Sequence, residues 1–372
     1  MKKGVLFSVC FFVIAAFLVG CGAKKDDTIK VAVAGPMTGS IAKMGSDFKN
    51  GATIAVEEWN AKGGVLGKKI EIVIGDDASD PKQAVAVANK LVNGGMAGIV
   101  GHFNSSCSIP ASEVYNRAGI PMITPASTNP QLTDRGLKGV FRICGRDDQQ
   151  GKVGAEFVKG KLNSKKVAVI HDKTTYGQGL ADEFKKNLSA ATEVVYYGGV
   201  TIGDKDFKSV LTSVKEKKPE IIYFGGVFPE AGLMVKQARE IGLSSPFMSG
   251  DGTIDPKFIE IAGEKAAEGT YLSFSPDPKN IPAAQAFIEK YKAKFGELGP
   301  YSIYAYDAMN ALLTGIKEAG SADGKPVTDK LHALEFSGAL GKYRFTEKGD
   351  IAGSPYVIWI TKNGKFEEHW KP

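Results

Sequence analysis

Short apolar strands alternate with helical stretches along most of the chain, and the alternation runs through two successive series. The strands of the first series are residues 29–34, 69–75, 97–100, 121–124 and 140–144, and those of the second are 166–171, 192–198, 220–224, 247–249 and 270–274. Most are separated by segments with apolar residues at helical spacing. This pattern predicts parallel sheets with helices on both faces, because parallel strands need crossover connections.

The size of the chain agrees with two such units. Its 372 residues exceed one usual domain, which has about 100 to 200 residues. The composition, 43% hydrophobic and 24% charged, is that of a globular protein. We therefore predict an α/β fold with two doubly wound parallel-sheet lobes. Two long helical stretches, 283–295 and 301–319, follow the second series, and an amphipathic strand pair is expected around 343–345 and 356–361.

Charge and motifs exclude several classes of function. The net charge is only +6 and basic residues are interleaved with acidic ones, so nucleic acid is not an expected partner. No spacing typical of a metal site, a nucleophile elbow or a phosphate loop is present, and we expect no metal, no cofactor and no enzyme. We interpret the four histidines as ordinary strand-end or surface residues: His102, His171, His332 and His369.

The start of the chain has the features of an export signal. Lys2 and Lys3 precede an apolar run from Val5 to Val19, which is shorter than the roughly 20 residues of a membrane-spanning helix. We therefore predict that residues 1–20 are a signal peptide and that the folded part lies outside the cytoplasmic membrane.

The end of this run, Leu18-Val19-Gly20-Cys21, resembles a bacterial lipobox. That resemblance implies that Cys21 carries the lipid of a membrane anchor, with residues 21–28 as a polar tether; the alternative is a plain secreted protein with an incidental cysteine. In this oxidising compartment Cys107 and Cys144 can form a disulfide if their Cα atoms lie within about 7 Å.

Polar turns follow several strands, at the edge of the sheet where ligands of open α/β folds bind. They are residues 101–106 and 125–130 in the first half, and 171–177 and 249–252 in the second. Hydroxyl groups and free amides at the start of a helix, as around Ser105, suit a carboxylate or a phosphate. Asp251, between two glycines, is placed to pair with an ammonium group.

Five ordered motifs resemble the branched-chain amino acid binding proteins of ABC transporters. They are DDASDPKQAVAVANKLV, GHFNSSCSIPAS, MITPASTNPQLT, HDKTTYGQGLA and YFGGVFPEAG, and the likeness extends from residue 29 to residue 360. The resemblance implies the periplasmic binding protein type I fold, with two lobes joined by three crossovers around an enclosed amino acid. We expect lobe 1 at 29–146 plus 275–354, and lobe 2 at 147–274 plus 355–372.

The same resemblance implies roles for individual residues. Ser105 would bind the ligand carboxylate together with the turn Ala126-Ser127-Thr128, and Asp251 would bind the ammonium group. Tyr176 is similar to a family tyrosine that closes over the ligand.

The pocket wall departs from the family pattern. Met44 and Val227 stand where the leucine, isoleucine and valine binders have tyrosines, and Asp251 replaces a glutamate. An apolar ligand side chain therefore remains the expectation. We expect this wall to include Met44, Phe103, Tyr176, Val227, Phe228 and Tyr301.

These features predict a monomeric receptor that captures an amino acid with an apolar side chain and delivers it to an ABC transporter permease. Two alternatives remain open at this point. One is the same fold binding another small carboxylate or amide, such as an aromatic acid or a γ-amino acid. The other is an anchored envelope enzyme.

The lipid anchor predicts the behaviour of one variant. Cys21→Ser removes the thiol that is acylated, so the precursor should stay unprocessed and unlipidated. Metabolic labelling with a fatty acid and immunoblotting of membrane fractions measure both properties. Normal processing and membrane retention of the variant would contradict the anchor.

Overall fold

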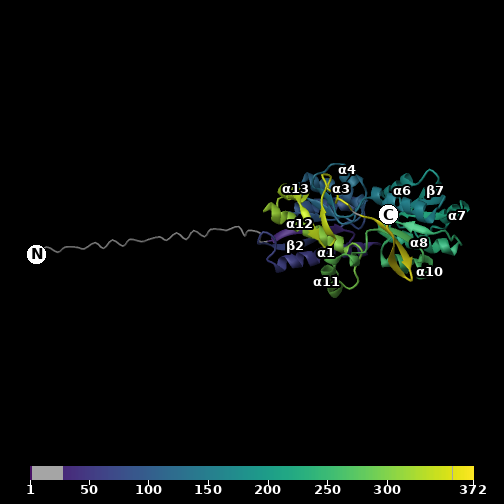
Figure 1. Cartoon of the computed structure of the whole chain (residues 1–372). Helices are drawn as coiled ribbons and strands as arrows, with labels where there is room; N and C mark the ends of the chain where they lie inside the picture. The colour runs from purple at the N-terminus through teal and green to yellow at the C-terminus, as the bar shows by residue number, and fades with distance from the viewer. Residues whose placement is uncertain (2–27, 354) are drawn as a thin grey trace.

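The computed structural model describes residue 1, residues 28–353 and residues 355–372, which form two lobes side by side (Figure 1). The expected signal peptide, Cys21 and nearly all of the tether lie outside the described residues. Within the described ranges no helix combines the length and the apolar character needed to cross a bilayer.

The sheet of lobe 1 has five parallel strands. Their spatial order is β2 (Lys69–Asp76), β1 (Thr28–Gly35), β3 (Ile99–Val100), β4 (Met122–Thr124) and β5 (Val140–Arg142). The central strands are mostly apolar and buried, as is typical of a parallel sheet with helices on both faces. This arrangement places the ends of β3 and β4 next to each other.

The sheet of lobe 2 has seven strands. Their order is β14 (Lys365–Trp370), β13 (Val357–Lys362), β10 (Tyr271–Phe274), β9 (Phe247–Ser249), β8 (Ile221–Gly225), β6 (Lys166–His171) and β7 (Glu193–Gly199). The strands β6 to β10 are parallel, and β13 and β14 add an antiparallel edge.

Helices cover these sheets and define the two cores. In lobe 1 they are α1 (Ala42–Ala61), α2 (Pro81–Asn93), α3 (Ser105–Arg117), α4 (Gln131–Asp134), α11 (Gln285–Phe295), α12 (Ser302–Ala319) and α13 (Gly324–Ala333). In lobe 2 they are α5 (Asp147–Phe157), α6 (Thr175–Asn187), α7 (Lys208–Glu216), α8 (Phe228–Glu240), α9 (Pro256–Ala262) and α10 (Glu264–Ala267).

The chain passes between the lobes three times: after β5, after β10 and before β13. The long helix α12 packs on α1 and α13, so the segment after β10 returns to lobe 1. The predicted α/β fold with two doubly wound lobes is confirmed. The residue boundaries that we expected for the lobes stay a prediction, and the two sheets are compatible with them.

The predicted pairing of residues 343–345 with 356–361 is wrong. The structure instead contains two local hairpins, β11 (Glu335–Gly338) with β12 (Gly341–Arg344), and β13 with β14. The turn between β13 and β14 is Asn363-Gly364, with φ angles of 49° and 70°. This dipeptide favours a two-residue hairpin, so one edge of β13 pairs with β14, while its other edge pairs with β10 and not with residues 343–345.

His102 differs from a surface histidine. Its side chain is completely buried, with Nδ1 2.7 Å from Asp77 Oδ2 and Nε2 3.0 Å from the Tyr115 hydroxyl. Asp77 also accepts a hydrogen bond from the backbone of Ser79. The imidazole therefore joins β2, β3 and α3 beneath the loop that carries Ser105.

Cys107 and Cys144 are both free and buried, so the disulfide that the sequence allowed is not formed. Burial raises the pKa of both thiols well above the usual range, which keeps them protonated and unreactive.

Because both cysteines are free and buried, the number of thiols that react with a thiol reagent should depend on unfolding. In a protein produced without residues 1–21, a thiol reagent should react slowly with the native form and should find two thiols after denaturation without a reductant. A protein with no reactive thiol under the same denaturing conditions would show that the disulfide exists.

Candidate functional site

A small cavity lies between the lobes at the carboxyl ends of their strands. It is lined by Phe103, Asn104, Ser105, Ala126, Tyr176, Asp251 and Gly252. The first four come from the turns after β3 and β4 of lobe 1, and the others from α6 and the turn after β9 of lobe 2. The structure thus brings five of the expected site residues together around one cavity: Phe103, Ser105, Ala126, Tyr176 and Asp251.

On the lobe 1 side the hydroxyl group that lines the cavity is that of Ser105. Ser105 is the first residue of α3, and its Oγ accepts a hydrogen bond from the backbone N–H of Asn129 at 3.2 Å, which leaves its own proton free. Thr128 Oγ1 is buried next to Asp147 but makes no hydrogen bond of normal geometry within the described part of the chain. The amides at the start of α3 add a positive partial charge. This side suits an anion.

The polar groups of Ala126 and Ser127 already have hydrogen-bond partners within the turn. Their backbone N–H groups both donate to Thr124 Oγ1, at 3.0 and 3.2 Å. The Ser127 hydroxyl bonds to the carbonyl oxygen of Phe103 at 2.8 Å. These groups already stabilise the turn, so among the residues expected to bind a carboxylate only Ser105 and Thr128 have unused side-chain donors.

The lobe 2 side is dominated by the carboxylate of Asp251. Its Oδ1 accepts a hydrogen bond from the Tyr176 hydroxyl at 2.8 Å, and its Oδ2 accepts one from the Tyr301 hydroxyl at 2.7 Å. Burial raises the pKa of Asp251, and the two phenol donors oppose that rise. Gly250 and Gly252 flank the aspartate closely: a Cβ on either residue would lie less than 3 Å from Tyr176. The two glycines let the turn approach the tyrosine.

Three further polar side chains of this region are not predicted from the sequence. Asn104 lines the cavity and its Oδ1 is buried without a hydrogen bond. Asp147, at the start of α5, is fully buried, and neither of its carboxylate oxygens has a hydrogen-bond partner among the described residues. Gln150 lies one turn further along α5, and its Oε1 is likewise buried without a partner. These residues follow the ends of β3 and β5, and that position was the available signal.

Burial, and then the charge of Asp251, raise the pKa of Asp147 well above its ordinary value. A carboxylate in such surroundings requires a proton or a cation. The lobe 2 side therefore suits a cationic group.

The expected pocket wall is only partly assembled. Phe103 lines the cavity, and the ring of Tyr301 packs edge-on against it with centroids 5.1 Å apart. Met44, Val227 and Phe228 are buried in the hydrophobic core and do not line the cavity. Their contact with a ligand stays a prediction.

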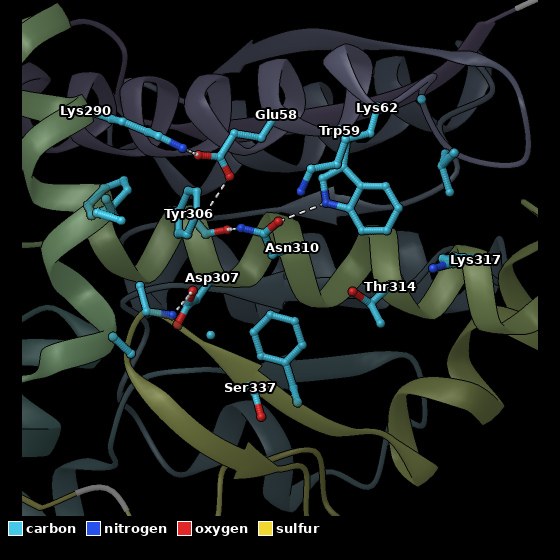
Figure 2. A pocket seen from close by; sticks show the side chains of 18 of the residues that line it. Glu58, Trp59, Lys62, Lys290, Tyr306, Asp307, Asn310, Thr314, Lys317 and Ser337 are labelled. Atoms are coloured by element: carbon cyan, nitrogen blue, oxygen red, sulfur yellow. Dashed lines mark hydrogen bonds and ion pairs between the residues drawn. The ribbon is translucent and has the colours of Figure 1, made fainter.

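A larger hollow, of about 690 Å³, lies on lobe 1 between α1, α11, α12 and β11 (Figure 2). Its central polar groups bond to one another: Tyr306 and Lys290 to Glu58, and Trp59 to Asn310. These groups have no need of a ligand, and we do not regard the hollow as the functional site. Within the described ranges no three or more His, Cys, Asp or Glu residues cluster as metal ligands.

Comparisons with known proteins agree with this geometry. The family model described as periplasmic binding protein matches residues 28–365. The chain is 45% identical over 345 residues to an amino acid binding protein of Pseudomonas aeruginosa, covering 91% of this chain and 92% of that protein. It is 42% identical over 367 residues to the Leu/Ile/Val-binding protein homolog 2 of Brucella abortus, covering 98% of both.

Solved structures show the same fold. A leucine binding protein from Thermotoga maritima superposes with a TM-score of 0.86 at 33% identity, over 92% of this chain and 99% of that one. The branched-chain amino acid binding protein LivJ of Streptococcus pneumoniae, in complex with isoleucine, gives a TM-score of 0.86 at 32% identity, over 93% and 100%. The chain therefore belongs to the periplasmic binding protein family, whose members bind solutes outside the cytoplasm and are not enzymes.

Proposed function

We propose that this protein is the amino acid receptor of an ABC importer and that its preferred ligand has an apolar side chain. One observation carries the proposal. A cavity between the lobes brings the free hydroxyl donor of Ser105 in lobe 1 close to the buried carboxylate of Asp251 in lobe 2. These two sides match the two charges of an amino acid zwitterion.

The carboxylate end of the ligand would bind to lobe 1. Ser105 and Thr128 supply the hydroxyl donors, and the first amides of α3 supply the favourable dipole. Ala126 contributes close packing at the cavity wall.

The ammonium end would bind to lobe 2. Asp251 is its direct partner, and Asp147 is a second buried carboxylate beside Asp251 that lacks a hydrogen bond. An ammonium group supplies positive charge and three N–H donors in one place. The buried carboxylates disfavour an aromatic acid as the ligand, because such a molecule has no cation to offer them.

The ligand side chain would lie against aromatic rings, since Phe103 lines the cavity and Tyr301 packs against Phe103. The names of the relatives support an aliphatic side chain: isoleucine is bound to LivJ of Streptococcus pneumoniae, and the Brucella abortus relative is named for leucine, isoleucine and valine.

Binding would be coupled to closure of the lobes. A ligand held by residues of both lobes stabilises the closed state, because the open state offers only half of the contacts. The closed, monomeric receptor then delivers the amino acid to the permease. We further propose that a lipid on Cys21 anchors the receptor after removal of the signal peptide 1–20, with residues 21–28 as the tether.

The charge pairing predicts an order of effects. Asp251→Ala should weaken amino acid binding by about 3 to 5 kcal/mol, because it strands a buried ammonium group. Ser105→Ala should cost about 1 to 3 kcal/mol, because the helix amides remain. Calorimetry with the preferred amino acid and with its deaminated analogue measures both. The analogue should bind poorly to the native protein and lose much less than the amino acid in Asp251→Ala.

Asp182→Ala provides the control, because Asp182 accepts a phenol hydrogen bond from Tyr197 away from the cavity. This variant should bind the amino acid normally. A coupling energy near zero between Asp251 and the ligand amino group would show that they do not interact.

The aromatic wall predicts the order of ligands. Leucine, isoleucine, valine or phenylalanine should outcompete alanine and serine, because each additional buried methylene contributes roughly 0.8 kcal/mol. A thermal-shift series followed by calorimetric competition measures this order. Equal affinities for serine and leucine would rule out an apolar pocket.

A further inference from the structure

The hydroxyl of Tyr301 forms a hydrogen bond across the cleft. Tyr301 directly precedes α12, which packs on α1 in lobe 1, whereas Asp251 follows β9 in lobe 2. Their oxygen atoms are 2.7 Å apart, and both side chains are buried. The donor and the acceptor thus belong to different lobes.

The surroundings of Tyr301 favour this bond. Its ring is held edge-on by Phe103 and Phe274, with centroids 5.1 and 5.6 Å away, so the hydroxyl has a defined direction. Burial and the charge of Asp251 raise the pKa of Tyr301 well above its ordinary value, so the phenol keeps the proton that it donates. A hydrogen bond to an ionised acceptor is roughly twice as strong as a neutral one.

This bond therefore links the two lobes directly across the cleft. A second cross-cleft bond, from Asn129 Nδ2 to the carbonyl oxygen of Thr175 at 2.8 Å, lies beside the same cavity. We infer that Tyr301 is a positioning residue that stabilises the closed receptor before any ligand binds and orients Asp251 toward the cavity. The ligand-binding part of this inference rests on the proposed function.

The carboxylate of Asp251 can accept the hydrogen bond from Tyr301 and bind the ligand at the same time. A carboxylate has about four acceptor sites, and the phenols of Tyr176 and Tyr301 occupy two of them. The side chain of Gln150 and a backbone N–H also stabilise this carboxylate, and an ammonium group would add its positive charge to these donors. Tyr301 should therefore contribute equally to the binding of every amino acid, whatever its side chain, which separates this role from that of a simple wall residue.

Tyr301→Phe tests the inference, because it removes the hydroxyl and keeps the ring. Spin labels on Lys82→Cys and Lys236→Cys, exposed positions on α2 and α8, report the distance between the lobes by pulsed electron resonance. Without ligand, the distance between the two spin labels in the variant should shift toward the longer value of the open lobes. With ligand, its affinity for every amino acid should fall by a common factor of about 10 to 100.

Tyr306→Phe is the matched control. It lies on the same helix and donates to Glu58 at 2.7 Å, but both residues belong to lobe 1 (Figure 2). This variant should leave the inter-lobe distance and the affinities unchanged. In an Asp251→Ala background, Tyr301→Phe should cause no further shift of the inter-lobe distance measured without ligand. This comparison tests the hydrogen bond even if Tyr301→Phe alone lowers the stability of the fold.

Three results would overturn the inference. They are an unchanged unliganded distance in Tyr301→Phe, a tighter affinity, or a change in the order of ligands without a common loss. Failure of every variant and of the native protein to bind any amino acid would instead refute the proposed function, and the unliganded distances would still decide the role of Tyr301.

Discussion

The carboxylate of Asp251 is the group on which the arrangement of the two lobes depends. It is buried in the seam between them, and a buried charge is tolerated only when it has hydrogen bonds or a cation. One bond comes from Tyr176 in its own lobe and one from Tyr301 in the other. In this arrangement both lobes contribute donors to the same buried charge.

The fold positions this charge by means of rigid strands and the short loops that follow them. Parallel sheets bring the turns after β3, β4 and β9 to facing edges, so short loops on rigid strands carry the polar groups. Buried contacts hold these loops from beneath, such as the Asp77–His102–Tyr115 chain under the Ser105 loop. The three crossings between the lobes leave the cleft able to open, because each lobe keeps its own core and sheet.

Errors of the sequence analysis have definite physical causes. The strand β13 pairs with β14 through the Asn363-Gly364 turn and with β10 on its other edge, and only the first of these partners has a local turn signal in the sequence. His102 was taken for an ordinary strand-end residue because nothing in the sequence shows that Asp77 and Tyr115 enclose it. The resemblance implies that Met44 and Val227 belong to the pocket wall; both are buried, and their contact with a ligand stays a prediction.

The sequence alone determined the alternation of strands and helices, the two-lobed α/β fold, and the turns that carry Ser105, Tyr176 and Asp251. These follow from local periodicity and from the position of polar residues after strands. Tertiary structure decided which side chains share one cavity, and it added Asp147 and the hydroxyl of Tyr301 to the site. Residues 251 and 301 belong to different lobes, and only packing of the lobes brings a buried charge to the donor that stabilises it.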